Sequence, residues 1–380
     1  MPPSRLHKRA LLCSGLALAA SLGLVDVVAA VVRKRAMRVK AGGVPVEILG
    51  FDVGEETTVV SLGPSSLSEH PGPVILWNTD KSAVCTLGNV LSSSGSALLR
   101  PVLGTLPSQF LGEASGFLYG HIGKTPSDLG LTYTDVLVGS STGWVIPPLG
   151  MAISENTWAI HVHGLGGGRN QTLRGLPVFS RSGVTSLVPT LGISLDRGEN
   201  HDRLGSFGMN EVAALESAHA YAIAQGAAKV VFVGWSYGAL AVVRAMASRR
   251  WADVGGLVLL SPALDWKLII SSGLEGAGIS SAVARLVMAR INSPVARQGS
   301  SRGVWDGVEG DLETVLSIWP TLVLHGDADT LVPRQQSLSL SQRFQGTVDA
   351  HFFPKSQHGM EWNSAQEEWE QIVGAWIEYH

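Results

Sequence analysis

From about Leu131 to the carboxyl terminus, short apolar runs of strand length alternate with segments of helix length. This alternation is typical of a parallel sheet with helices on both faces, because each helix returns the chain to the start of the next strand. The sequence therefore predicts an α/β fold with a mostly parallel sheet. We expect the clearest helices at residues 209–225, 236–249 and 365–377. We expect the strands at residues 131–138, 143–149, 157–164, 185–194, 229–234, 255–262, 320–326 and 348–354.

The residues before this region have a different character. From residue 41 to about residue 128, Gly, Ser and Pro are frequent, and short apolar or alternating runs show no helical periodicity. Such runs predict a small β-rich segment. We therefore divide the chain into an amino-terminal segment (1–40), a β-rich extension (41–128) and an α/β domain (129–380), with an insertion at about 263–319.

The amino-terminal segment contains a long apolar run, Ala10–Val32, in which Asp26 is the only charged residue. Its length matches a helix that crosses a bilayer, so we expect membrane association through a single span. The basic residues on both sides of the run leave its sidedness open. Two alternatives also stay open: a signal peptide cleaved near residues 28–30, which would give a secreted protein, and a helix of the hydrophobic core.

Composition excludes several classes of protein. The formal net charge of −3 argues against a broad basic surface, so we expect no nucleic-acid partner. The 16% of charged residues is too low for a highly charged disordered chain. The two cysteines, Cys13 and Cys85, make a disulfide framework improbable. The fold must therefore rest on its hydrophobic core, and no obligate protein partner is predicted.

The pattern G-x-S-x-G occurs three times, at residues 139–143, 234–238 and 299–303. In a chain with 45 glycines the pattern alone is weak, so its context decides. Ser236, in the second match, follows a β-branched run and precedes an alanine-rich segment of high helix propensity. A sharp turn from strand to helix exposes a serine for attack, which makes Ser236 the candidate nucleophile. The alternative is an ordinary serine at a strand-helix junction.

A serine nucleophile needs a base that takes its proton and a carboxylate that orients the base. The segment "PTLVLHGDADTLVP" carries Asp327 and Asp329 directly after a strand, at the sheet edge where open α/β sheets bind ligands. Asp329 is the first choice for the carboxylate, with Asp327 and Asp265 as alternatives. Among the histidines that follow Asp329, His358 lies in a loop beyond a strand end and is the candidate base.

A glycine-rich run, His163–Gly168, follows the strand expected at residues 157–164. Glycines let backbone amides approach the negative oxygen that develops when a serine attacks a carbonyl. Phosphate binding is the alternative, but the glycine spacing of phosphate-binding loops is missing. His161 and His163 share one face of the strand without a third ligand nearby, so we expect structural roles for them and no metal.

Together these segments resemble the α/β-hydrolase superfamily of serine hydrolases. "HGLGGG" resembles its oxyanion loop, "GWSYG" its nucleophile elbow, "HGDADTLVP" its acid turn and "SQHGMEW" its histidine loop, in the order of the family. The resemblance covers the chain from about residue 131 to its end. It implies Ser236 as nucleophile, His358 as general base and acid, Asp329 as orienting carboxylate, and the backbone amides of Leu165 and Tyr237 as oxyanion hole.

The resemblance implies an esterase or lipase-like enzyme that cleaves an ester-like acyl bond of a small molecule through an acyl-serine intermediate. It implies no metal and no organic cofactor. Peptidase, thioesterase and acyltransferase activities use the same apparatus, and a non-catalytic ligand-binding protein of the same fold is the alternative from another class. Within the insertion, an amphipathic run with Leu286, Val287 and Ile291 is either a lid over the pocket or a packed surface helix.

Overall fold

The computed structural model describes residues 23–39, 42–149, 156–197, 204–297 and 307–380. These residues form two compact units. The smaller unit combines the chain up to Arg38 with Asp265–Glu309, and the larger unit contains Val39–Leu264 and Gly310–His380.

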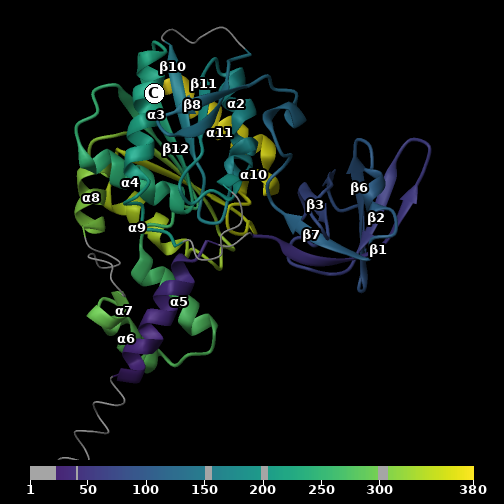
Figure 1. The fold of residues 1–380 in the computed structure, drawn as a ribbon, viewed down its shortest axis with the longest axis horizontal. Coiled ribbons are helices and arrows are strands. Elements are labelled where there is room, and N and C mark those ends of the chain that lie inside the picture. The colour runs from purple at the N-terminus through teal and green to yellow at the C-terminus, as the bar shows by residue number, and fades with distance from the viewer. Residues whose placement is uncertain (1–22, 40–41, 150–155, 198–203, 298–306) are drawn as a thin grey trace, which may run out of the picture. The chain divides into compact units, whose positions relative to one another are not determined.

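The main sheet of the larger unit is mixed and mostly parallel (Figure 1). Neighbouring strands from β11 to β15 run parallel, whereas the hairpin of β8 and β9 is antiparallel to β11. All the strands predicted from residue 131 onward are present. Their order across the sheet is β15 (Val348–Phe353), β14 (Thr321–Gly326), β13 (Val254–Leu260), β12 (Lys229–Trp235), β10 (Thr157–Val162), β11 (Thr185–Pro189), β9 (Ser141–Ile146) and β8 (Thr134–Val138).

Helices cover both faces of this sheet, so its central strands are buried on both sides. Val231 and Val233 of β12 share a buried cluster with Phe179 of α2 (Leu176–Arg181) and Trp369 of α11 (Gln366–Tyr379). Phe232 points to the opposite face, where α3 (Val212–Ala224) and α4 (Tyr237–Ser248) lie (Figure 1). The three helices predicted most clearly correspond to α3, α4 and α11.

The predicted β-rich extension is a closed antiparallel barrel. The strands follow one another around it in the order β1, β7, β3, β4, β6 and β2, and β2 pairs with β1 to close the ring. Its interior is filled by buried aliphatic side chains such as Val60, Leu62 and Leu118. The strands are β1 (Val44–Val53), β2 (Thr58–Leu62), β3 (Val74–Asn78), β4 (Val84–Leu87), β6 (Ala97–Leu103) and β7 (Ser115–Tyr119), with β5 (Ser92–Ser94) added beside β6.

The domain boundaries expected at residues 40 and 128 stay a prediction.

Further elements complete the larger unit. They are the short helices η1 (Ser108–Phe110), η2 (Pro126–Leu129), η3 (Arg169–Gly175), η4 (Leu195–Arg197), α9 (Gln335–Arg343) and α10 (Glu361–Ser364). Helix α8 (Val308–Leu316) begins at the junction of the two units.

The smaller unit consists of helices. They are a helix at residues 23–37, α5 (Trp266–Gly276), α6 (Ser281–Arg290) and α7 (Pro294–Arg297). Val287 of α6 and Ile291 after it are buried, whereas Leu286 is exposed. Two of these three side chains are therefore packed against protein, and the described residues of the insertion do not show the expected lid.

The predicted membrane span at residues 10–32 is wrong: within the described chain, no helix has the length and apolarity needed to cross a bilayer. Residues 10–22 of that run lie outside the described residues. In the remainder, Asp26 accepts hydrogen bonds from Arg290, Nε to Oδ1 at 2.8 Å and Nη2 to Oδ2 at 2.5 Å. The buried positions of this helix include Asp26, Ala29, Ala30 and Arg33, which is the spacing of one helix face packed against protein.

Candidate active site

Ser236 lies at the turn between β12 and α4, where its backbone adopts φ 53° and ψ −115°. Such a positive φ is strained for a residue with a side chain. The two flanking glycines are needed because the chain is crowded there. A Cβ on Gly238 would lie 2.2 Å from the carbonyl oxygen of Val162, and a Cβ on Gly234 would lie 2.6 Å from Cα of Ala239. The turn predicted from G-x-S-x-G is therefore present, with the serine at its bend.

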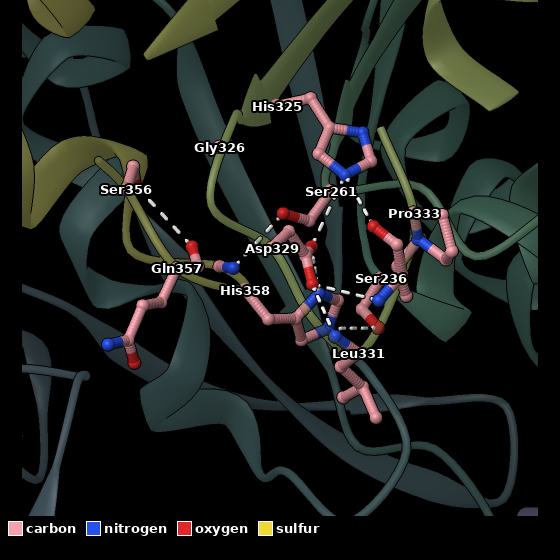
Figure 2. Close-up of polar contacts among 12 residues, drawn as sticks. Ser236, Ser261, His325, Gly326, Asp329, Leu331, Pro333, Ser356, Gln357 and His358 are labelled. Atoms are coloured by element: carbon pink, nitrogen blue, oxygen red, sulfur yellow. Dashed lines mark hydrogen bonds and ion pairs between the residues drawn. The ribbon is translucent and has the colours of Figure 1, made fainter. Parts of the chain in front are cut away.

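The side chain of His358 lies within hydrogen-bonding distance of both Ser236 and Asp329 (Figure 2). The distance from Ser236 Oγ to His358 Nε2 is 2.8 Å, and the distance from His358 Nδ1 to Asp329 Oδ2 is 2.6 Å. Each residue follows the carboxyl end of a different strand, β12, β15 and β14 respectively. With the proton of His358 on Nδ1, that nitrogen donates to the carboxylate and Nε2 accepts the proton of the serine hydroxyl.

Asp329 is buried and its two oxygens have different partners. Oδ1 accepts hydrogen bonds from the backbone N–H groups of Leu331 at 2.9 Å and Val332 at 2.8 Å, while Oδ2 faces His358. Burial by itself would raise the pKa of Asp329, but hydrogen bonds from His325 and His358 outweigh it, so the pKa is lower than usual. The carboxylate therefore stays charged at neutral pH.

His325 is a second histidine on this carboxylate, and the sequence interpretation did not single it out. It is fully buried at the end of β14, and its Nε2 lies 2.9 Å from the carbonyl oxygen of Val332 and 3.2 Å from Asp329 Oδ2. Its Nδ1 lies 2.6 Å from Ser337 Oγ. Its position directly before "GDAD" at a strand end was the available signal. His325 thus contacts the same carboxylate oxygen as His358 and helps to fix the acid turn.

The alternative carboxylates lie in structural positions. Asp327 accepts a hydrogen bond from the backbone N–H of Lys355 at 2.6 Å, and Asp265 caps α5 by accepting one from Leu268 N at 3.0 Å. The first G-x-S-x-G match lies at the hairpin turn between β8 and β9. The third match lies outside the described residues.

The glycine-rich loop after β10 borders the same site. Gln171 Oε1 accepts a hydrogen bond from the backbone N–H of Gly164 at 2.6 Å, which holds the loop close to Ser236. Gly166 adopts a φ of 72°, a conformation that favours glycine. Leu165 lines the cavity in front of Ser236. An oxyanion hole formed by the amides of Leu165 and Tyr237 stays a prediction.

The side chain of Tyr237 makes hydrogen bonds that are separate from the role expected of its backbone amide. Its hydroxyl oxygen accepts hydrogen bonds from the N–H groups of Ser206 at 2.9 Å and Gly208 at 2.8 Å, and donates to Glu211 at 3.2 Å. The ring is almost completely buried. Tyr237 therefore fixes the chain around residues 206–211 with its side chain, and its main chain follows Ser236 directly.

The two histidines of β10 have protein partners. His161 Nε2 lies 3.1 Å from Ser186 Oγ, and His163 Nδ1 lies 2.9 Å from the carbonyl oxygen of Gly164. Both rings are buried, and burial lowers the pKa of His161 to about 3, so it is neutral. These contacts agree with structural roles.

A cavity of about 570 Å³ opens in front of Ser236 and His358. Trp235 of β12 and Leu165 of the loop after β10 contribute to its wall, and the barrel contributes Trp77 and Tyr119. Both parts belong to the larger unit. The cavity walls therefore come from the α/β region and from the extension together.

No protein-family model matches the chain, and no curated protein matches it. Among solved structures, the chain is similar to an esterase of Pyrococcus furiosus, at 17% identity and a TM-score of 0.51 over 68% of this chain and 94% of that one. A second crystal form of that esterase gives 17% identity and a TM-score of 0.50 over 68% of this chain and 96% of the other. At such identity the likeness establishes the fold: the chain has the α/β-hydrolase fold, as the sequence resemblance implied.

Proposed function

We propose that the protein is a serine hydrolase that cleaves an ester-like acyl bond through an acyl-serine intermediate. One observation carries the proposal: two hydrogen bonds join Asp329, His358 and Ser236 in a row at the cavity. A serine at this position has a base for its proton, and the base has a carboxylate for its own positive charge.

In the first half-reaction, Ser236 Oγ attacks the carbonyl carbon of the substrate while its proton passes to His358 Nε2. The imidazolium that forms donates from Nδ1 to Asp329, whose lowered pKa keeps it a carboxylate. The carbonyl oxygen becomes negative and accepts hydrogen bonds from the N–H groups of Leu165 and Tyr237. The bond to the leaving group then breaks, and the leaving alcohol takes the proton from His358 Nε2.

The second half-reaction repeats these transfers with water. His358 Nε2 takes a proton from a water molecule that attacks the acyl-serine, and returns it to Ser236 Oγ as the acid departs. The balanced products are one alcohol and one carboxylic acid. Every proton transfer uses the same nitrogen, which the Asp329 hydrogen bond keeps directed at the serine.

The cavity favours a small-molecule ester. Its volume of about 570 Å³ falls in the range of small-ligand pockets, and the rings of Trp77 and Tyr119 give it aromatic walls. The name of the similar Pyrococcus furiosus protein suggests the same substrate class. Peptide, thioester and acyl-transfer reactions use the same machinery, so esters are compared with matched amides and thioesters in the assay.

The test is labelling with a fluorophosphonate probe followed by turnover of p-nitrophenyl butyrate. Ser236→Ala is expected to abolish both, whereas Ser141→Ala, in the other described G-x-S-x-G match, is expected to keep both. Circular dichroism and thermal unfolding check that each variant is folded. Persistent labelling of Ser236→Ala, or a folded wild type that neither labels nor turns over any acyl substrate, would contradict the proposal.

A further inference from the structure

The segment that follows His358, residues 359–364, is buried between the barrel and the main sheet of the larger unit. Met360 is 3% exposed and belongs to the buried cluster of the barrel, together with Val60, Leu62 and Leu118. A residue two positions from the candidate base is thus part of another element's hydrophobic core.

Asn363 forms hydrogen bonds with the barrel region and with Arg174 at the same time. Its Nδ2 donates to the carbonyl oxygens of Pro73 at 2.6 Å and Gly120 at 2.8 Å, both in the barrel region. Its Oδ1 accepts a hydrogen bond from Arg174 Nη1 at 2.6 Å, and the same nitrogen donates to the carbonyl oxygen of Gly359 at 2.5 Å. Asn363 is 2% exposed, so these are buried bonds whose loss leaves polar groups unpaired.

The barrel surface is shaped for this contact. A Cβ on Gly72 would lie 1.6 Å from the carbonyl oxygen of Asn363, and a Cβ on Gly120 would lie 2.1 Å from Met360 Sδ. Arg100, fully buried, donates to the carbonyl oxygen of Gly72 at 2.7 Å and so fixes the backbone on the barrel side. The barrel therefore meets the segment with a rigid, close-fitting backbone.

The main sheet holds the same segment from the other side. Ser261 Oγ accepts a hydrogen bond from the N–H of Gly359 at 3.0 Å and donates to the buried carboxyl group of Glu361. Glu361 also accepts a hydrogen bond from the N–H of Gly326 at 3.1 Å, in the turn that leads to Asp329. His358 is thus the last residue before a stretch that is fixed on both sides.

We propose that the barrel positions the catalytic histidine. Met360 and Asn363 are the positioning residues whose contacts with the barrel keep His358 in place. The inference rests on the proposed function. A shift of about 1 Å in a reacting group reduces turnover by about a hundredfold, because the reaction needs aligned atoms. Asn363 and Gly72 lie outside the cavity wall, so a displacement of His358 caused by their variants lowers kcat and leaves KM nearly unchanged. Met360 itself lines the cavity, so its variant is expected to change KM as well.

The experiment compares Met360→Ala with Leu62→Ala, a matched control that removes the same number of heavy atoms from the same barrel core. We expect both variants to unfold at lower temperature, and only Met360→Ala to lose kcat, by about 30–100-fold. Met360→Leu, which preserves the volume, is expected to restore kcat to within about threefold. Equal kcat losses in Met360→Ala and Leu62→Ala would mean a general effect of stability and would overturn the proposal.

A second variant acts from the barrel side without changing any residue of the segment. Gly72→Ala places a methyl group against the carbonyl oxygen of Asn363 and is expected to lower kcat by at least about tenfold at unchanged KM. Gly72→Ala also tests whether the barrel positions His358 if Met360→Ala does not fold. Wild-type kcat in Gly72→Ala and Asn363→Ala, in an enzyme that Ser236→Ala inactivates, overturns the positioning proposal alone. A wild type without any labelling or turnover instead overturns the proposed function.

Discussion

Asp329→Asn keeps the shape of the side chain and removes its charge, and the structure fixes how the new amide must lie. Oδ1 is held by two backbone N–H donors, from Leu331 and Val332, which cannot change their chemistry. The oxygen of the asparagine is therefore expected to take that place, and its NH₂ group to face His358 Nδ1. His325 Nε2, which also lies near Oδ2, keeps the carbonyl oxygen of Val332 as an acceptor at 2.9 Å. Two donors cannot pair, so the proton of His358 moves to Nε2.

The consequence for catalysis is large. A histidine with its proton on Nε2 cannot accept the proton of Ser236, although the distance of 2.8 Å between them is kept. For this kind of tautomer exchange the expected loss in kcat is about 10⁴-fold. This corresponds to about 5 kcal/mol of transition-state stabilisation. KM is expected to change little, because Asp329 is buried behind His358.

The assay is hydrolysis of p-nitrophenyl butyrate by wild type, Asp329→Asn and Asp327→Asn at one pH, with thermal unfolding of each protein as a check. Asp327 lies in the same turn and contacts only backbone of Lys355 among the hydrogen bonds described for it. Asp327→Asn is therefore expected to stay within about threefold of wild type. A folded Asp329→Asn that retains more than about a tenth of wild-type kcat would refute the tautomer argument.

Three further outcomes are expected. Burial raises the pKa of Glu361, so wild type is expected to lose stability relative to Glu361→Gln as the pH rises above about 4.3. The loss is up to about 1.4 kcal/mol per pH unit until the folded-state pKa is reached. Parallel stability profiles of the two proteins in urea denaturation from pH 4 to 8 would contradict this. Gly238→Ala is expected to destabilise the protein by about 1–3 kcal/mol, since the clash with Val162 outweighs the helix propensity of alanine of about 1 kcal/mol, and a higher urea midpoint would disprove the close approach. Burial also raises the pKa of the Cys85 thiol to about 12. In a Cys13→Ser background, the reaction of Cys85 with Ellman's reagent at pH 8 is therefore expected to be about a thousandfold slower in native than in urea-unfolded protein. Equal rates would show an accessible thiolate.

Local patterns were sufficient for much of the fold. The strands and the clearest helices follow from apolar runs, β-branched residues and alanine-rich segments, because these properties act within a few residues. The same holds for the turn at Ser236, where Gly234 and Gly238 stand at the crowded positions. The choice of Asp329 and His358 was also available from their places after strand ends. Their roles as catalytic residues stay a prediction.

The amino-terminal run shows where a local pattern misled. Apolar length alone suggested a span, but the spacing of Asp26, Ala29, Ala30 and Arg33 is that of a helix with one face packed on protein. The charge of Asp26 finds its partner in Arg290, which is 264 residues away in the sequence. A window of sequence cannot contain such a partner, so the pattern could not exclude the wrong interpretation.

The sequence by itself determined the α/β order, the position of the strand-to-helix turn at Ser236 and the β-rich character of the extension, because propensity, periodicity and glycine placement are local properties. Only the tertiary structure decided that the extension closes into a barrel, since closure depends on pairing β2 with both β1 and β6, and that His325 contacts Asp329 together with His358. It alone placed Met360 in the barrel core and Asn363 on the barrel backbone, about 290 residues from Pro73. Contacts over such separations form through packing and hydrogen bonds between distant elements, which the order of residues does not reveal.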